Sequence, residues 1–366
     1  MSKKIKIGIL TGGGDCAGLN AAVKWVTKTA LDRQTETERN FQYEVVGIKD
    51  GWKGLSFTNT KELEDNTMPL TENVVRTWDR LGGTYLGTSR FNPYSSKNNT
   101  SKTTLANIKH LGIDVLVAIG GDDTLSVAAK LHQDGVPVVG IPKTIDKDLF
   151  GTDYTLGFET AVEVITDIVD KLRTTAGSHS RVFVIETMGR SAGWLALKAG
   201  ESSGSYITLI PEYDFDMQRV NELILEGRKG GARYDIVIVS EGAKEKGGSI
   251  VARDEKFDAF GHETLGGIGE HVAAQITKGT GIETRCVVLS HIQRGGAPCA
   301  YDRRMGRYFG IAAMNLIDKK QWGQLVCSKE GKISSVPIVN VLGHLSLVDV
   351  PTMYDTLRYN GSRNIL

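Results

Sequence analysis

Two stretches decide the fold of this chain, VLVAIGGDDT at residues 115–124 and PVVGIPKTIDKD at residues 137–148. Each opens with a short apolar run, which favours a strand buried in a parallel sheet. In each stretch the apolar run is followed by glycine, aspartate or lysine residues. Because the carboxyl ends of parallel strands lie at one edge of an open α/β sheet, where ligands bind, we expect both loops at that edge. Their residue types predict a site for polyphosphate chemistry.

The alternation of strand and helix extends outward from these stretches. Ile5–Leu10 predicts a strand, residues 11–15 a glycine turn and Ala17–Leu31 a helix, and the alternation restarts after Gly157. This pattern indicates an α/β fold with mostly parallel sheets. We expect two Rossmann-like three-layer domains with an active site in the cleft between them. The first would hold residues 1–157 plus about 293–345, and the second about 158–292 plus the C-terminal tail.

The remaining predicted elements continue the same order along the chain. Further strands are expected at 45–48, 115–119, 136–141, 181–186, 207–210 and 236–240. Further helices are expected at 102–111, 124–133, 159–173, 191–199 and 216–228. The polar stretches 95–101 and 242–248 predict surface loops.

The composition is that of a globular protein, with 366 residues, 40% of them hydrophobic and 24% charged, and a net charge of +1. Such a charge gives no overall field for nucleic acid or an anionic membrane, so neither is expected as a partner. The four cysteines, at positions 16, 286, 299 and 327, lack zinc-binding spacing, and we expect reduced thiols. No apolar run approaches the ~20 residues of a membrane span. We therefore expect a soluble, cytoplasmic protein.

The glycine turn after the first predicted strand carries a weak phosphate signal. Gly13 and Gly14 lack side chains, so backbone amides and the positive end of the following helix can approach a phosphate. Such turns also join strands to helices for steric reasons alone, and the two interpretations stand equal here. The spacing is not that of a P-loop, since no Gly-Lys-Ser/Thr follows.

Carboxylates follow the two glycines of the central loop. Asp122 is a suitable ligand for Mg²⁺, which prefers one or two carboxylates plus phosphate oxygens. Asp122 or Asp123 is also suited to cap the helix that follows. Two adjacent carboxylates would repel an additional anionic group unless a cation intervenes.

The next loop supplies both signs of charge, with Lys143 close in sequence to Asp146 and Asp148. In phosphoryl transfer a carboxylate accepts the proton of the attacking hydroxyl, while lysine and Mg²⁺ neutralise charge on the phosphoryl group and its leaving group. Asp146 is the candidate base. The alternative is a solvated turn of mixed charge.

Arginines recur near later strand ends, together with a glutamate and a histidine. Arginine makes bidentate contacts to phosphate, and glutamate and histidine bind sugar hydroxyls, so these residues favour a sugar phosphate over a nucleic acid. A single arginine is otherwise more often a surface ion pair. The residues are Arg181, Arg190, Glu241, Arg285, His291 and Arg294.

Taken in order, the motifs resemble the phosphofructokinase family from the first strand to at least Arg307. They are LTGGGD at 10–15, GTSRF at 87–91, GGD at 120–122, TID at 144–146, MGR at 188–190 and HIQRGG at 291–296. The resemblance implies phosphorylation of the 1-hydroxyl of fructose 6-phosphate, with Asp146 as base and Asp122 holding Mg²⁺. The first domain would then bind the phosphoryl donor and the second the fructose 6-phosphate.

The resemblance also implies three residue sets. The donor would contact Gly13, Gly14, Arg90, Gly121, Asp123, Thr124 and Lys143. The sugar phosphate would contact Thr144, Ile145, Asp146, Arg181, Met188, Gly189, Arg190, Glu241, Arg285, His291 and Arg294. The catalytic set would be Asp123, Lys143, Asp146, Asp148 and Arg190. Because Arg181 and Arg285 reach a neighbouring subunit's site in this family, a homodimer or homotetramer is expected.

Two positions distinguish the phosphoryl donor. ATP-using members of the family usually carry glycine where this chain has Asp123 and Lys143. A carboxylate at Asp123 would repel the α-phosphate of ATP, whereas Lys143 can bind the phosphate left when pyrophosphate is cleaved. The chain thus resembles the pyrophosphate-dependent, shorter actinobacterial-like members. Lys147 departs from the asparagine that is usual in the family, and its cation either acts on Asp146 or points to solvent.

Other functions are less well supported. An ATP-dependent enzyme of the same family would need Asp123 to swing away from the donor. A dehydrogenase would need Gly-x-Gly-x-x-Gly with an acidic residue about 20 positions later, which is absent. A non-catalytic regulatory subunit would lose the base or the metal ligand, yet Asp146 and Asp122 are both present.

Overall fold

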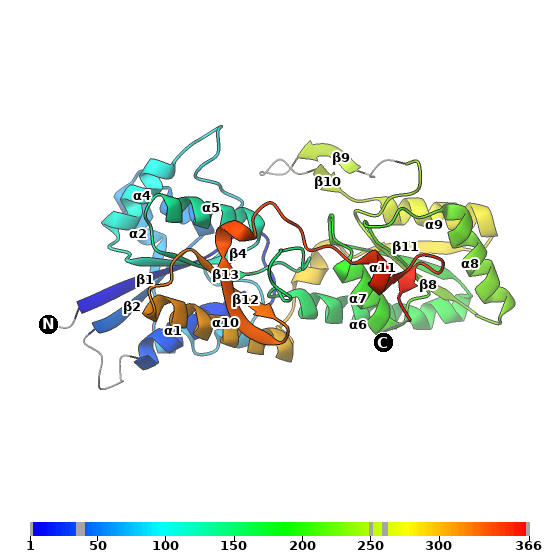
Figure 1. The fold of residues 1–366 in the computed structure, drawn as a ribbon. Helices are drawn as coiled ribbons and strands as arrows, with labels where there is room; N and C mark the ends of the chain where they lie inside the picture. The colour runs from blue at the N-terminus through cyan, green and yellow to red at the C-terminus, as the bar shows by residue number, and fades with distance from the viewer. Residues whose placement is uncertain (1–2, 34–40, 249–251, 258–262, 364–366) are drawn as a thin grey trace. The chain divides into compact units, whose positions relative to one another are not determined.

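The chain folds into an α/β structure built on two mostly parallel sheets, as the sequence predicted (Figure 1). The computed structural model describes residues 3–33, 41–248, 252–257 and 263–363. It divides into two compact units. The first unit comprises Met1–Thr144, Leu149–Thr160 and Arg294–His344, and the second comprises Ile145–Asp148, Ala161–Gln293 and Leu345–Leu366. Ile145–Asp148, which the sequence analysis placed in the first domain, thus packs with the second unit.

The first unit contains a seven-stranded sheet in the order β13-β12-β5-β4-β1-β2-β3. The five inner strands are parallel, and β13 and β3 pair antiparallel at the edges. β4 is buried along its whole length, as expected for a central strand with helices on both faces. The strands are β1 Lys3–Thr11, β2 Phe41–Ile48, β3 Thr67–Pro69, β4 Val115–Gly120, β5 Val138–Pro142, β12 Gln324–Lys329 and β13 Lys332–Pro337.

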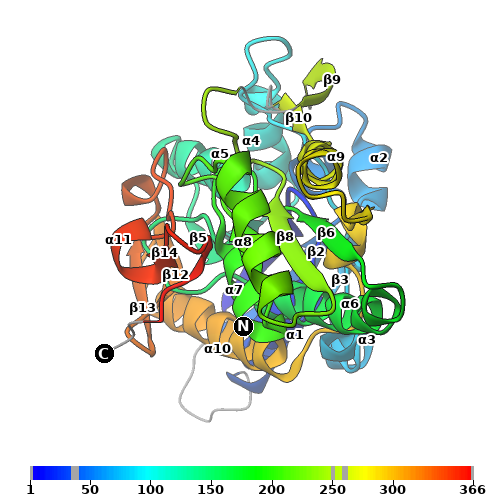
Figure 2. The same ribbon diagram turned by 90° about the vertical axis from the view of Figure 1, so that its right-hand side faces the viewer.

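Helices cover both faces of this sheet. α1 (Leu19–Asp32) and α10 (Ala300–Asp318) pack together on one face, and α4 (Ser101–His110) and α5 (Asp122–Gln133) lie on the other (Figures 1 and 2). The short helices are α2 Thr60–Asp65, α3 Glu72–Val75 and the 3₁₀ turns Gly51–Leu55, Trp78–Arg80 and Ile338–Asn340.

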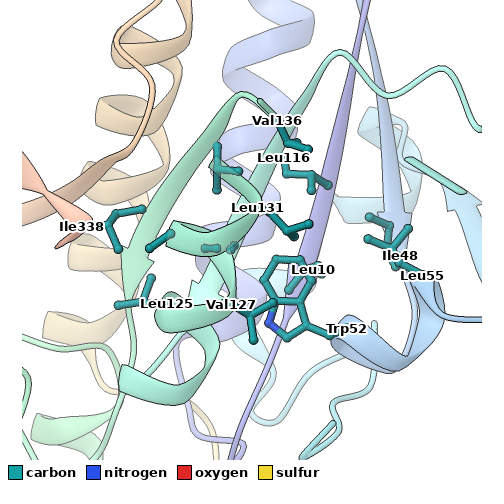
Figure 3. Close-up of a cluster of buried hydrophobic side chains, with 14 of the residues drawn as sticks. Leu10, Ile48, Trp52, Leu55, Leu116, Leu125, Val127, Leu131, Val136 and Ile338 are labelled. Atoms are coloured by element: carbon teal, nitrogen blue, oxygen red, sulfur yellow. The ribbon is translucent and has the colours of Figure 1, made fainter. Parts of the chain in front are cut away.

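A hydrophobic cluster fixes α5 against the sheet. Leu125 and Leu131 of α5 pack with Leu10 of β1, Leu116 of β4 and the indole of Trp52 (Figure 3). All five side chains are essentially inaccessible to solvent. Because this core holds α5 rigidly, the start of the helix is fixed just beyond the end of β4.

The second unit contains a four-stranded parallel sheet in the order β11-β6-β8-β7. Its strands are β6 Val182–Thr187, β7 Ile207–Leu209, β8 Asp235–Ser240 and β11 Thr284–Val288. Its helices are α6 Phe158–His179, which begins in the first unit, α7 Trp194–Ser203, α8 Met217–Lys229, α9 Ile268–Thr280 and α11 Val350–Met353. Two small antiparallel pairs are β9 Ala252–Phe257 with β10 Glu263–Leu265, and β14 Tyr354–Asp355 with β15 Asn360–Gly361.

Most predicted elements appear with their ends shifted by a few residues. The helix predicted at 191–199 begins only at Trp194, because Gly193 is its N-cap. The surface prediction for 242–248 was wrong for Gly242 and Ala243, which are buried. A side chain at Gly242 would lie 1.7 Å from the carbonyl oxygen of Arg190, so this residue packs tightly against that loop.

Two bulk expectations can be compared with the structure. All four cysteines are free thiols, as predicted. Within the described part of the chain, no helix has both the length and the apolar character needed to cross a bilayer.

Candidate functional site

The loops after β1 and β4, and the start of the loop after β5 (Lys143 and Thr144), meet at one edge of the first unit's sheet, here called the first edge. β1 and β5 flank β4 in parallel register, so the three strands end side by side. The main-chain ladder continues into the loops, where Gly12 N donates to Ile119 O at 3.0 Å and Lys143 N donates to Gly120 O at 3.0 Å. The expectation that the two central loops share a sheet edge is therefore confirmed.

Part of the glycine content at the first edge has a steric cause. A Cβ at Gly12 would lie 2.6 Å from Thr124 Oγ1, and one at Gly120 would lie 2.3 Å from Thr124 Cβ. Thr124, in the first turn of α5, is buried against both glycines. These two glycines therefore let α5 approach the sheet closely. For Gly12 this agrees with the steric interpretation of the glycine turn, in which glycine only joins a strand to a helix.

Two cations lie against the other glycines of the same turn. Lys143 is only 3% exposed, and its Nζ donates to Gly14 O at 2.6 Å. A Cβ at Gly13 would stand 3.3 Å from Lys143 Nζ, and one at Gly14 would stand 2.5 Å from Nη1 of Arg294. Nη1 of Arg294 also donates to Asp15 O at 3.1 Å. Gly13 and Gly14 therefore lack side chains at the point where the cations of Lys143 and Arg294 approach the turn. A small, positively charged turn of this kind suits an anionic ligand.

The loop that carries Arg90 is tied to the first edge through its neighbours. Thr88 Oγ1 donates to Gly13 O at 2.6 Å, and Ser89 O accepts from Gly13 N at 3.4 Å. Arg90 itself is exposed. Thr144, which follows Lys143, accepts through its carbonyl oxygen from Thr155 Oγ1 at 2.6 Å. The structure therefore brings Gly13, the loop that carries Arg90, and Thr144, which was predicted for the sugar phosphate, to the first edge.

The two carboxylates after β4 lie in the first turn of α5. Gly121 is the N-cap residue, so neither Asp122 nor Asp123 is the N-cap suggested as an alternative. Asp122 is exposed and Asp123 is half-buried. In this position both benefit from the positive end of the helix dipole.

The acidic side chains of the first edge can be tested as a metal site. Among the residues that the structure describes, no group of three or more His, Cys, Asp or Glu side chains could hold a metal ion. An all-protein cage is thus not built, whereas Mg²⁺ commonly uses one or two carboxylates plus substrate phosphates. Exposed Asp122, beside the cation-lined glycine turn, fits that second pattern.

The loops after β6, β8 and β11 meet at the carboxyl edge of the second unit's sheet. Together with Glu186 near the end of β6 and residues 145–148 of the same unit, they are here called the second edge. Arg190 N donates to Glu241 Oε1 at 3.3 Å, which joins the loops after β6 and β8. Gln293 accepts from Met188 N at 3.2 Å and donates to Ser290 O at 2.9 Å, which joins the loops after β6 and β11. The predicted residues Met188, Gly189, Arg190, Glu241 and His291 are thereby held at one edge.

Carboxylates at the second edge interact strongly with one another. Burial, and after it the negative charge of Asp146, raises the pKa of Glu241 to about 7. The main-chain N–H of Arg190 acts in the opposite direction, and Glu186 adds a smaller upward effect. Asp146 is 7% exposed and packs in the same unit, between buried Ile145 and half-buried Asp148. Asp146 and Glu241 therefore share one electrostatic environment.

Two residues with clear roles in this arrangement were not selected from the sequence. Gln293 is 1% exposed and clamps two loops, and its only sequence signal was membership of the motif at 291–296. Glu186 is 3% exposed and accepts from Gly267 N at 3.1 Å and Gly269 N at 2.8 Å, at the start of α9. A buried glutamate in a strand was the signal that could have identified it.

Arg181 and Arg285 lie away from the second edge. Arg181 precedes β6 and Arg285 is near the start of β11, so both stand at the amino end of this parallel sheet. Each pairs with Glu283, at 2.7 Å from Arg181 Nε and 2.6 Å from Arg285 Nη2. The structure does not bring these two arginines together with Arg190 and Glu241 of the same chain.

The fold and the loops place this chain in a class of α/β proteins that have two units. In this class the parallel strands end in glycine-rich and charged loops. The phosphofructokinase family model matches residues 6–317, most of the chain. The chain therefore belongs to the phosphofructokinase family.

Relatives of known name cover nearly the whole chain. The pyrophosphate–fructose 6-phosphate 1-phosphotransferase of Streptomyces coelicolor is 43% identical over 96% of this chain and 98% of that protein. The protein of the same name from Dictyoglomus thermophilum is 44% identical over 97% and 98%. The ATP-dependent 6-phosphofructokinase of Corynebacterium efficiens is 40% identical over 94% and 95%. These names agree on the enzyme family and differ in the phosphoryl donor.

A solved structure agrees in fold. The pyrophosphate-dependent phosphofructokinase from Marinobacter aquaeolei superposes with a TM-score of 0.80, covering 98% of this chain and 89% of that chain. Its sequence is 19% identical, so this likeness concerns the fold alone.

Proposed function

We propose that this phosphofructokinase uses pyrophosphate as its phosphoryl donor. It would transfer one phosphoryl group, reversibly, to the 1-hydroxyl of fructose 6-phosphate and release phosphate, in glycolysis or gluconeogenesis. The observation that carries the proposal is the buried ammonium of Lys143, 2.6 Å from Gly14 O at the glycine turn of the first edge.

A buried lysine in this position limits what the first edge can hold. Its ammonium is fixed by a main-chain oxygen and lies close to Gly13, so it occupies space beside the turn. It would neutralise the phosphate that leaves when pyrophosphate is cleaved. Half-buried Asp123 would repel a third phosphate, which ATP has and pyrophosphate lacks. Gly13, Gly14, Arg90, Gly121 and Thr124 would complete the donor site.

A magnesium ion would belong to the donor site. Asp122 would hold Mg²⁺ together with phosphate oxygens, and the bound ion would supply charge neutralisation on the pyrophosphate. The protein's own cations, Lys143 and Arg90, would orient the same phosphates.

The second unit would supply the acceptor chemistry. Asp146 would take the proton of the 1-hydroxyl as that oxygen attacks phosphorus, and Arg190 would stabilise charge on the transferring group. A protonated Glu241 would remove one negative charge beside Asp146, leaving Asp146 as the proton acceptor. The further sugar-phosphate contacts would be Thr144, Ile145, Met188, Gly189, His291 and Arg294, and Asp148 would belong to the catalytic set.

Arg181 and Arg285 would serve the site of a neighbouring subunit. Their position at the amino end of the second unit's sheet, on the opposite side from Arg190, supports this role. Activity would then require a homodimer or homotetramer. Free thiols at all four cysteines are consistent with a reducing compartment, and we propose a cytoplasmic enzyme.

The alternative donor is ATP, because relatives at 40% identity carry that name. Initial rates with pyrophosphate and with ATP, at equal Mg²⁺ and saturating fructose 6-phosphate, distinguish the two. We expect a kcat/KM for pyrophosphate at least about 100-fold above that for ATP, equivalent to about 3 kcal/mol of discrimination. Efficient turnover with ATP alone would reject the proposal.

A further inference from the structure

The loop that carries the proposed base contains a lysine in an unfavourable backbone conformation. Lys147 lies between Asp146 and Asp148 and has φ 54°, in the left-handed region. The Cβ makes this region unfavourable for residues other than glycine, but asparagine enters it more readily than lysine because its short polar side chain can hydrogen-bond locally. Such a conformation persists only where surrounding contacts hold it, so the contacts of Lys147 must stabilise it.

Lys147 takes part in a closed ring of contacts within the second unit. Its Nζ lies 4.5 Å from the centroid of the Trp194 ring, within the range of a cation–π interaction. Nε1 of Trp194 donates to Ser346 O at 2.9 Å, and Ser346 N donates to Asp148 O at 2.8 Å. Because Asp148 follows Lys147 in the chain, these four residues close a ring.

The ring connects two loops that the proposed reaction uses. Trp194 is the first residue of α7 and directly follows the loop at 188–193 that carries Arg190. The carboxylate of Glu212 accepts from Gly193 N at 2.9 and 3.1 Å and from Val348 N at 2.9 Å. The start of α7 and the C-terminal segment at 345–348 are therefore held by one side chain.

We propose that Lys147 is a positioning residue, whose ammonium over Trp194 fixes the loop at 145–148 against α7 so that Asp146 keeps the orientation needed for proton transfer. The inference rests on the proposed role of Asp146 as base. An asparagine at 147 would suit the backbone, but its side chain is too short to reach the indole. The lysine is therefore explained by its reach and charge. The sequence analysis expected the Lys147 cation either to act on Asp146 or to point to solvent. The structure shows a third arrangement, in which the cation contacts the ring of Trp194.

Three substitutions of Lys147 distinguish the effects of its backbone conformation, its side-chain length and its charge. Lys147→Met keeps an unbranched stem without charge, Lys147→Asn relaxes the backbone, and Lys147→Arg keeps a cation for the ring. We expect Met and Asn to lower kcat about tenfold with KM for fructose 6-phosphate changed less than about threefold, and Arg to stay within about threefold of wild type. Lys130→Met is the matched control, because Lys130 lies 5.5 Å from the Tyr94 ring, outside the proposed machinery, and should retain wild-type kcat.

A double-mutant cycle with Trp194→Leu tests the contact itself. If the lysine acts through the indole, Lys147→Met in the Trp194→Leu background should lower kcat by less than about twofold. Melting temperatures of the position 147 variants close to that of wild type would show that lost kcat is not lost folding. Wild-type kcat in Lys147→Met, an equal loss in Lys147→Arg, or additive losses in the cycle would each overturn the proposal.

The assay uses whichever donor the wild-type enzyme turns over, so a wrong donor assignment leaves this test intact. Asp146→Asn is measured alongside. If that variant keeps wild-type kcat, the proposed base is wrong. If it loses activity while Lys147→Met does not, only the positioning role fails.

Discussion

The first and second edges both bury a charged side chain, but of opposite sign. At the first edge the buried charge is the ammonium of Lys143, bonded to Gly14 O. At the second edge the buried acids are Glu186 and Asp146 with the largely buried Glu241, and main-chain N–H groups hold Glu186 and Glu241. At both edges a main-chain group from another segment pairs with a buried charge, at Lys143 and at Glu186 and Glu241. Burial without such a partner would cost several kcal/mol.

The contrast suggests how one fold separates two chemical tasks. A cation among glycines leaves room and positive charge for a phosphate-rich donor. Burial and the negative charge of Asp146 both raise the pKa of Glu241, so a protonated Glu241 would leave Asp146, the proposed base, to accept the proton. The comparison predicts that changes at the second edge affect the chemical step, whereas changes at the first edge affect the choice of donor.

The largest expected effect is at Asp146. Asp146→Asn removes the proposed proton acceptor and should lower kcat by about 10²–10⁴-fold, with a much smaller change in KM for either substrate. Steady-state kinetics with both substrates varied would measure this. Asp167→Asn, the same change at an exposed residue of α6, is the control and should retain wild-type kcat. A variant with unchanged turnover would show that the second edge does not supply the base.

A smaller but more selective effect is expected at the first edge. Asp123→Gly combined with Lys143→Gly removes the carboxylate and the buried ammonium, and should lower kcat/KM for pyrophosphate by about 100-fold while improving relative use of ATP. The internal control is KM for fructose 6-phosphate, which should change less than about threefold. Unaltered pyrophosphate kinetics in this variant would show that these residues do not select the donor.

Local sequence pattern predicted the first edge better than the second. The apolar run at 115–119 and the glycines after it identify a buried strand and its turn, and β4 with the start of α5 follows that pattern closely. Even at the first edge, local pattern could not place Arg294, because it contacts Asp15 across 279 positions of sequence. The clamp by Gln293 depends likewise on packing between loops that are distant in the chain.

The surroundings of Lys147 show a second limit of sequence reasoning. The residue type was visible as a departure, yet its contact with Trp194 depends on a left-handed backbone and on the fold of α7. By contrast, the separation of Arg181 from Arg190 could have been predicted from the sequence. Arg181 precedes a strand and Arg190 follows it, and the two ends of one strand lie at opposite edges of a sheet.

The smallest expected effect concerns the stability of the second unit and its dependence on pH. Glu241 has its pKa raised from 4.5 to about 7, chiefly by burial and then by Asp146, so the folded protein favours the protonated form. Its contribution to stability is therefore complete below about pH 4.5 and is lost as the pH rises through about 7. With allowance for partial exposure, the loss is about 2 kcal/mol.

Glu241→Gln imitates the protonated side chain and should remove this dependence. The variant should match wild type near pH 4 and exceed it by about 2 kcal/mol near pH 8, measured by urea unfolding without substrates. Glu163→Gln, at an exposed residue of α6, corrects for the general effect of removing one carboxylate. Equal differences between variant and wild type at both pH values would mean that Glu241 does not carry the proton. The second edge would then lack the protonated carboxyl that distinguishes it from the first.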